Sequence, residues 1–267
     1  MFFPLHDQNN EAVKTVPMVS YTIIGLCLLV HLYTVILGIG ETGQMKQIHF
    51  IYRHGLVPQA FFSGQSQYQI GAQNLGIETP AAKRLGKGEA NELARLQSEI
   101  LTVRSSAFWV WLMPLTCMFL HASWMHILTN MWFFWIFADN VEEKMGLPLF
   151  VGFYLIVGVF SSMAHALIQS ASGVPMIGAS GAVSGVMGAY LVLFPRNKIT
   201  SYFCPIWFFI RRIDVPAIVV LGCYLLLNML QLSQSGKFGA NVAFDAHIFG
   251  FLGGLALGTL FRRSGRA

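Results

Sequence analysis

Charged residues are scarce in this chain of 267 residues: Asp, Glu, Lys and Arg make up 11% of it, against roughly a quarter of an average soluble domain. Hydrophobic residues make up 55%, and the mean hydropathy is +0.57. This balance excludes an ordinary water-soluble fold and favours a protein embedded in a lipid bilayer.

Several patterns that carry other functions are also missing. The chain has only four cysteines, all in or next to apolar segments, so we expect no disulfide. There is no His-Glu-x-x-His zinc motif and no pair of intramembrane aspartates, so the zinc-dependent and aspartyl classes of intramembrane protease fit poorly. The net charge of +5 comes from scattered basic residues without a basic and aromatic stripe, so we expect no nucleic-acid partner.

Six apolar runs are long enough, at about 20 residues per crossing, to span or nearly span a bilayer as helices. They lie at 18–37, 107–138, 147–168, 176–194, 213–232 and 242–261. The second run is too long for one crossing and is interrupted by Pro114, so we expect its membrane helix to begin near Ser123. The preceding part, with Trp109 and Trp111, is expected to lie at the membrane interface.

The predicted fold is an all-α membrane protein, a bundle of six transmembrane helices with a long loop between helices 1 and 2. Its expected parts are an N-terminal segment at 1–17, a membrane domain at 18–261 that includes the long first loop with interfacial helices at 39–122, and a basic tail at 262–267. Within that loop, 63–80 is rich in Gly, Gln and Ser and predicts a flexible segment. Residues 89–104 carry apolar side chains at helical spacing and predict an amphipathic helix.

Basic residues predict the orientation. With six spans both termini share one side, and that side would carry Lys14, Lys144, Arg196, Lys198, Arg211, Arg212, Arg262, Arg263 and Arg266. The short loops on the other side carry only Lys237, so both termini are expected in the cytoplasm, and Glu142-Glu143-Lys144 is expected to be a solvated cytoplasmic turn. The small size and bare six-span layout favour the inner membrane of a bacterium.

Polar residues inside membrane spans are functional candidates because each polar group there needs a partner. The second span opens with His126 and Asn130, the fourth with Gly178-Ala179-Ser180-Gly181, and the sixth with Asp245-Ala246-His247. These three spans run in the same direction, so the polar groups reach a similar depth in the outer half of the membrane.

Small residues on two of these spans predict that they are neighbours. The expected helix-packing glycines are Gly178, Gly181, Gly185 and Gly188 at the fourth span and Gly250, Gly254 and Gly258 on the sixth. If the strips face each other, Ser180 and His247 come within the roughly 2.6–3.2 Å that proton transfer requires.

A serine and a histidine at that distance are the minimum for an activated nucleophile, with Ser180 attacking and His247 as base. The oxyanion formed by attack needs donors, for which His126, Asn130 and the backbone N–H of Ser180 are suitable. Each such donor lowers the barrier by on the order of 3 kcal/mol.

Structural roles compete with each of these assignments. Ser180 could serve only in packing, with its hydroxyl bonded to the preceding turn, and His247 could be a structural hydrogen bonder. His126 and Asn130 could tie the first loop to the bundle. Asp245 and His247 lie two positions apart on the same predicted helix, so their side chains point in different directions. A catalytic triad that includes Asp245 is therefore disfavoured. His121 and His165 are expected to be structural.

The ordered residues His121, His126-xxx-Asn130, Gly178-Ala179-Ser180-Gly181 and Ala246-His247-xx-Gly250-xxx-Gly254 resemble those of the rhomboid intramembrane proteases with a bacterial-type layout of six spans. The resemblance implies a Ser180–His247 dyad without a required acid, an oxyanion site of His126, Asn130 and the Ser180 amide, and single-span membrane proteins as substrates. It implies no metal or nucleotide.

Two features depart from the family pattern. Ser184 occupies a position where several members carry an aromatic residue that packs on the catalytic imidazole, so another group is expected to hold His247. The first loop is also longer than in compact members, and the sequence gives no indication of its role or of the oligomeric state.

Two other functions remain open from the sequence. One is an inactive rhomboid-like protein that binds membrane clients, although such relatives usually lack the serine or the histidine. The other is a channel or transporter, which the clustering of polar residues in one leaflet and the lack of an inverted repeat disfavour.

Overall fold

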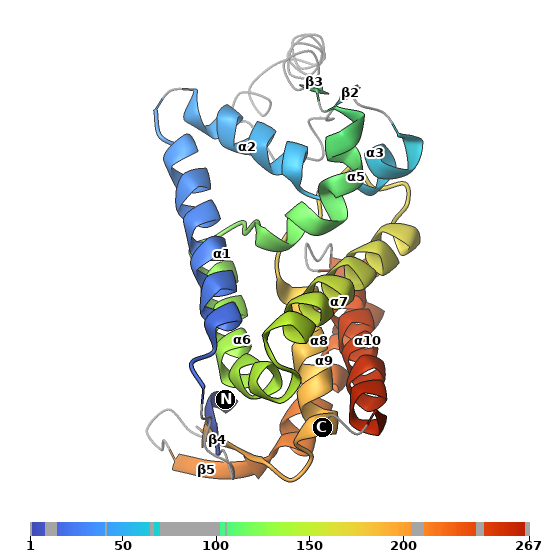
Figure 1. Ribbon diagram of the computed structural model, residues 1–267. Helices are drawn as coiled ribbons and strands as arrows, with labels where there is room; N and C mark the ends of the chain where they lie inside the picture. Colours follow the sequence, from blue (N-terminus) through green and yellow to red (C-terminus); the bar gives the residue numbers. More distant parts are fainter. Residues whose placement is uncertain are drawn as a thin grey trace.

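The computed structural model describes residues 2–8, 15–40, 42–64, 67–69, 102–104, 106–203, 211–238 and 243–264. Its main body is a helical bundle (Figure 1) made of α1 (Met18–Leu37), α6 (Trp124–Met145), α7 (Leu147–Ile168), α8 (Ser180–Leu193), α9 (Ala217–Phe238) and α10 (Phe244–Arg263). The helices of the predicted six-span layout are therefore all present, and the helical membrane bundle is confirmed.

Three of these helices, α1, α7 and α10, are long and apolar enough to span a bilayer on their own. A further span exists among the described residues if α5 (Ala107–Thr116) and α6 are counted as one broken crossing, since the two are bent by 77°. α8 and the Ala217–Ser233 part of α9 are apolar but shorter.

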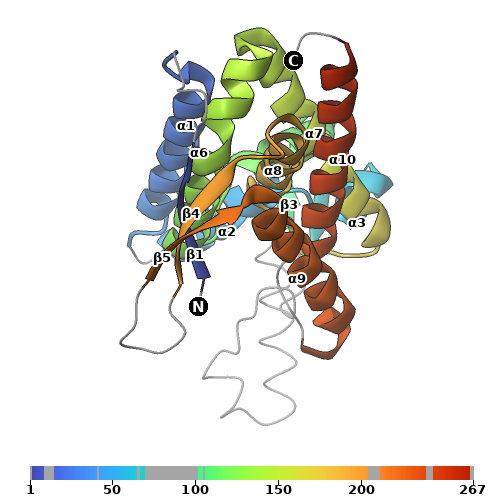
Figure 2. The ribbon, with the colours of Figure 1, turned by 90° about the horizontal axis from the view of Figure 1, so that it is seen from below.

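α8 occupies the centre of the bundle. Every residue from Gly181 to Tyr190 is buried, whereas α9 leaves Leu226, Leu227 and Leu230 on an exposed face. Figure 2 shows α8 enclosed by the other helices, with α9 and α10 on one side of it. A central helix lined by small residues lets its neighbours approach closely.

The break before α6 lies where the sequence predicted it. Ser123 is the N-cap of α6, and its Oγ accepts a hydrogen bond from the backbone N–H of His126 at 3.2 Å. α5, which carries Trp109 and an exposed Trp111, precedes it at a steep angle and is followed by a single 3₁₀ turn, η2 (Cys117–Phe119).

The first loop forms a cap at one end of the bundle. It contains α2 (Gly43–His54), α3 (Pro58–Ser63) and a small antiparallel pair, β2 (Gln67–Gln69) with β3 (Thr102–Arg104). The predicted amphipathic helix at 89–104 lies almost wholly outside the described residues, and its last three residues form β3 instead. Most of the predicted flexible segment at 63–80 is also outside them.

A three-stranded sheet at the opposite end was not predicted (Figure 1). It has the order β1 (Phe2–Gln8), β4 (Lys198–Phe203) and β5 (Arg211–Pro216), with both pairs antiparallel. The first strand therefore pairs with the loop between α8 and α9. The C-terminal end of α10 lies at the same end of the bundle, as expected of two termini that share a side.

The expectation that Glu142 belongs to a solvated turn was wrong. Its side chain is buried and accepts hydrogen bonds from Val19 N at 2.8 Å, Ser20 N at 2.7 Å and Ser20 Oγ at 2.6 Å. The first N–H groups of a helix have no partner within the helix, and a carboxylate from α6 satisfies those of α1.

Candidate active site

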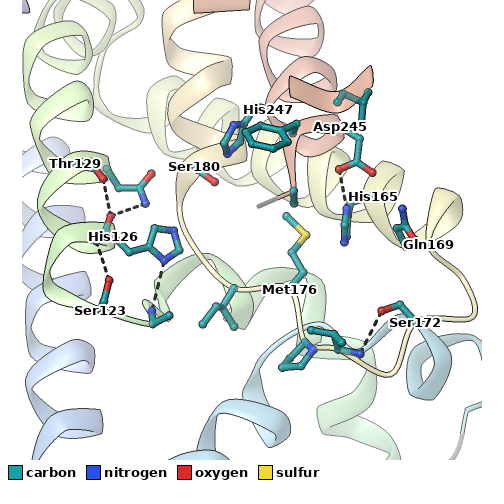
Figure 3. A pocket seen from close by; sticks show the side chains of 18 of the residues that line it. Ser123, His126, Thr129, His165, Gln169, Ser172, Met176, Ser180, Asp245 and His247 are labelled. Atoms are coloured by element: carbon teal, nitrogen blue, oxygen red, sulfur yellow. Dashed lines mark hydrogen bonds and ion pairs between the residues drawn. The ribbon is translucent and has the colours of Figure 1, made fainter. Parts of the chain in front are cut away.

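A cavity of about 690 Å³ opens where α6, α8 and α10 begin. Its polar lining includes Ser123, His126, Asn130, His165, Ser180 and His247. Figure 3 shows Ser180 and His247 side by side at the cavity and His126 facing it from α6. The cavity thus gathers the three polar groups that the sequence assigned to one depth.

The chain before Ser180 takes a conformation that requires glycine. Gly178 has φ of +124°, which L side chains rarely adopt, and its N–H donates to Cys117 O at 2.9 Å. A Cβ on Gly178 would lie 2.8 Å from His126 Nε2 and 3.8 Å from Ser180 Oγ. Gly178 therefore permits the close approach of His126 on α6 to the chain that leads into α8, and its assignment as a helix-packing glycine stays a prediction.

The first loop is hydrogen-bonded to the serine segment, residues 172–179, which leads into α8. Leu56 N donates to Met176 O at 3.0 Å, Met176 N donates back to Leu56 O at 2.8 Å, and Gln59 N donates to Ser172 O at 3.0 Å. Gly55 fits tightly there, because a Cβ would lie 2.9 Å from Ile177 Cγ2. These bonds give the loop a role that its sequence did not indicate, which is to fix the backbone that leads into α8.

The glycine strips of α8 and α10 face each other. A Cβ on Gly250 would overlap the carbonyl oxygen of Gly181, and one on Gly254 would overlap that of Gly185. A Cβ on Gly258 would meet Ala189 Cα at 3.0 Å. The two backbones are therefore in direct contact beside Ser180 and His247.

His247 is held by a residue that the sequence did not single out. Its Nδ1 lies 2.7 Å from Oδ1 of Asn228 on α9, and Nδ2 of Asn228 donates to Tyr224 O at 2.9 Å. A signal existed, because Asn228 is a polar residue within the apolar run 213–232, and such residues are functional candidates by default.

Ser184 is also tied to α9. Its Oγ lies 2.7 Å from Ser180 O and 2.7 Å from the hydroxyl oxygen of Tyr224. A hydroxyl has one proton to donate, so Ser184 donates to the carbonyl and accepts from Tyr224. An aromatic residue from α9 thus lies beside Ser184.

Among the described residues, no partner occupies one ring donor of His126, which lies on the side of the cavity. Its Nδ1 accepts from Ala122 N at 3.4 Å, which assigns the proton of the neutral ring to Nε2, the nitrogen beside Gly178. Asn130 uses one N–H on His126 O at 2.9 Å, and its second N–H is not committed to that bond. The bond from Ala122, the last residue of the first loop, joins His126 to that loop, whereas the side-chain hydrogen bond of Asn130 stays within α6.

Asp245 is engaged away from His247. Its Oδ1 is 2.8 Å from His165 Nδ1 and accepts from Ala246 N at 2.9 Å, so it links α10 to α7. His121 is buried, its carbonyl lies 3.2 Å from His31 Nδ1, and its ring lies 5.1 Å from that of His126. Both arrangements agree with the structural roles expected for His165 and His121.

Within the described residues, no group of three or more His, Cys, Asp or Glu side chains is placed to hold a metal ion. The three cysteines of that part, Cys27, Cys117 and Cys223, are free, and Cys204 lies outside it.

Comparison with known proteins identifies relatives of this helical domain. A family model described as the Rhomboid domain matches residues 108–264. The chain is 30% identical over 105 residues to the mouse "Presenilin-associated rhomboid-like protein, mitochondrial". The matched region covers 39% of this chain and 28% of the mouse protein. It is 28% identical over 144 residues to "RHOMBOID-like protein 5" of Arabidopsis thaliana, covering 54% of this chain and 42% of that protein.

A bacterial relative is matched over more of its length. The chain is 28% identical over 152 residues to the Bacillus subtilis protein described as "Putative rhomboid protease YdcA", covering 56% of this chain and 67% of that protein. The matches to the mouse and plant proteins span less than half the length of those relatives.

Proposed function

The chain belongs to the rhomboid family of membrane proteins, and on that premise we propose that it is an intramembrane serine endopeptidase. Ser180 is the nucleophile and His247 the general base. The observation that carries the proposal is that both side chains line one cavity, on helices whose backbones are in contact at Gly181 and Gly250.

The positions of the donors and acceptors support the following reaction. His247 takes the proton of Ser180 Oγ through Nε2 as the oxygen attacks the scissile carbonyl carbon. The oxyanion receives hydrogen bonds from Nε2–H of His126 and from the Ser180 backbone N–H, which has no partner within its helix because it lies in the first turn. Asn130 supplies its second amide N–H.

The tetrahedral intermediate then collapses. His247 gives its proton to the leaving amine, the peptide bond breaks, and the acyl chain stays on Ser180. A water molecule that reaches the cavity is deprotonated by His247 and releases the acyl group by the same sequence of steps. The polar lining contributed by Ser172 and Gln169 suits a cavity that holds water.

The proposed substrates are single-span membrane proteins, presented from the bilayer to the cavity at the ends of α6 and α10. The proposed location is a bacterial cell membrane with both termini in the cytoplasm. Relatives come from mitochondria, a plant and a bacterium, so this location rests on the layout and charge of the sequence.

The test uses purified protein in detergent with a fluorophosphonate probe, which labels an activated serine. We expect labelling of the wild type and its loss in Ser180→Ala and His247→Ala. Ser264→Ala, which removes a serine at the far end of α10, is the matched control and keeps labelling. Cleavage of a model single-span substrate in liposomes should follow the same pattern. A folded wild type that neither labels nor cleaves would refute the proposal and favour a client-binding protein.

A further inference from the structure

We propose that Asn228 is a positioning residue that holds His247 in the tautomer and orientation a general base needs, so that α9 takes part in building the active site. This inference rests on the proposed function and deepens it. It begins from a polar side chain on a helix that carries none of the predicted catalytic residues.

The orientation of the Asn228 amide is fixed by its second contact. The Nδ2 group donates to Tyr224 O at 2.9 Å, and a flipped amide would set two oxygens against each other there. The oxygen of Asn228 therefore faces His247 Nδ1 at 2.7 Å. Asn228 is 5% exposed, so little water competes for this bond.

The bond selects one tautomer of His247. An amide oxygen accepts hydrogen bonds and cannot donate, so Nδ1 of the neutral ring carries the proton. The other nitrogen, Nε2, then has a free lone pair, which is the form required to remove the proton of Ser180. Without Asn228, the ring is free to protonate Nε2 and to rotate.

Other groups that could orient the ring are engaged elsewhere. Asp245 bonds to His165, and Ser184 bonds to Ser180 O and to Tyr224. Phe244 is a ring neighbour of His247 at 6.2 Å between centroids, which restricts the ring but does not choose a tautomer. In the part of the chain that the structure describes, Asn228 is the polar side chain bonded to His247.

The two polar links of α9 lie one helical turn apart. Tyr224 reaches Ser184 on α8, and Asn228 reaches His247 on α10. The opposite face of α9 is apolar and exposed at Leu226, Leu227 and Leu230. His247 is therefore oriented as a base only when α9 packs against α8 and α10.

The kinetic test compares Asn228→Ala and Asn228→Asp with Leu227→Ala, which changes an exposed neighbour on α9. We expect Asn228→Ala to lower kcat by about 10- to 100-fold, the size of the loss when a partner that orients a metal-bound histidine is removed, with KM changed less than about threefold. Asn228→Asp keeps an acceptor oxygen and is expected to retain activity within about tenfold of the wild type at alkaline pH. Leu227→Ala should match the wild type in both constants.

The pH profile gives a readout that a merely structural role would not move. A carboxylate at position 228 stabilises the imidazolium form of His247, and that form cannot act as a base. The acid limb of the pH–rate profile of Asn228→Asp should therefore shift to higher pH than in the wild type. A wild-type kcat in Asn228→Ala together with an unshifted limb in Asn228→Asp would overturn the proposal.

A spectroscopic measurement separates this inference from the proposed function. In protein labelled with ¹⁵N-histidine, the His247 signals, assigned by their loss in His247→Ala, should show the proton on Nδ1 in the wild type and a mixture of tautomers in Asn228→Ala. A proton on Nε2 in the wild type would overturn the positioning role whether or not the protein cleaves substrates. The expected tautomer in a protein without Ser180-dependent cleavage would count against the proposed function alone.

Discussion

The contact between α8 and α10 can be tested with a single added methyl group. Alanine at Gly254 places a Cβ in overlap with the Gly185 carbonyl oxygen, so the two helices must separate by more than about 1 Å to restore van der Waals distance. Gly254 lies on the same helix as His247, seven residues further on, and the separation moves His247 away from Ser180.

The expected effect on activity is large because catalysis depends steeply on geometry. A misplacement of about 1 Å costs about 100-fold in rate, so the rate of fluorophosphonate labelling of Gly254→Ala should fall by about that factor. Overpacking costs about 1–3 kcal/mol, partly offset by the roughly 0.5–1 kcal/mol that alanine gains over glycine in a helix. The free energy of unfolding should fall by about 1–2 kcal/mol.

Two other glycines serve as graded controls. Gly258→Ala meets Ala189 Cα at 3.0 Å and should have a milder effect, while Gly152→Ala on α7 has nothing within 4 Å and should label at the wild-type rate. Labelling rates in detergent and unfolding in mixed micelles of SDS and a mild detergent measure both quantities. If Gly254→Ala labels and unfolds like the wild type, the close approach of α8 and α10 is not what assembles the site.

Three further predictions concern carboxylates that accept hydrogen bonds within the bundle. Glu142→Ala should lower the free energy of unfolding in mixed micelles by about 3 kcal/mol, because it removes the acceptor of three hydrogen bonds. Ser20→Ala should lower the free energy of unfolding by less. Equal stability of Glu142→Ala and wild type would contradict the capping role of Glu142. Burial raises the pKa of Asp7 above 3.8, so its contribution to holding β1 is present below that pH and is lost as the pH rises through the raised value. Amide hydrogen exchange in β1, corrected for intrinsic rates, should increase with pH in the wild type and not in Asp7→Asn. His165→Ala should lower the unfolding midpoint, since the buried Asp245 loses the imidazole that hydrogen-bonds to it, and Asp245→Asn should restore part of the loss.

Local features of the fold could be predicted from the sequence where one segment decides them. The start of α6 at Ser123 follows from a capping residue after a proline-containing run, and the pairing of α8 with α10 follows from two strips of small residues. The gathering of Ser180, His126 and His247 at one depth follows from the order and direction of the spans. None of these steps needs contacts between distant polar segments.

Other features depend on such contacts and could not be predicted. The sheet of β1, β4 and β5 pairs the first residues of the chain with residues about 200 positions away, and neither partner has a pattern that specifies the other. Glu142 belongs to a charged run typical of a solvated turn, and its burial depends on where α1 begins in space. The bonds from Leu56 and Gln59 to the serine segment likewise arise only once the first loop has folded over the bundle.

The substitution at Ser184 and the bond from Asn228 are two parts of one arrangement. A small hydroxyl side chain at 184 leaves room for Tyr224 to reach α8 from α9, and its oxygen accepts the Tyr224 proton that would otherwise be buried without a partner. Tyr224 in turn presents its carbonyl to Nδ2 of Asn228, which fixes the amide that faces His247. An aromatic residue at 184 would occupy the space of Tyr224 and displace α9. His247, which the family pattern packs against an aromatic neighbour on the serine helix, is therefore held here by a side chain of a different helix.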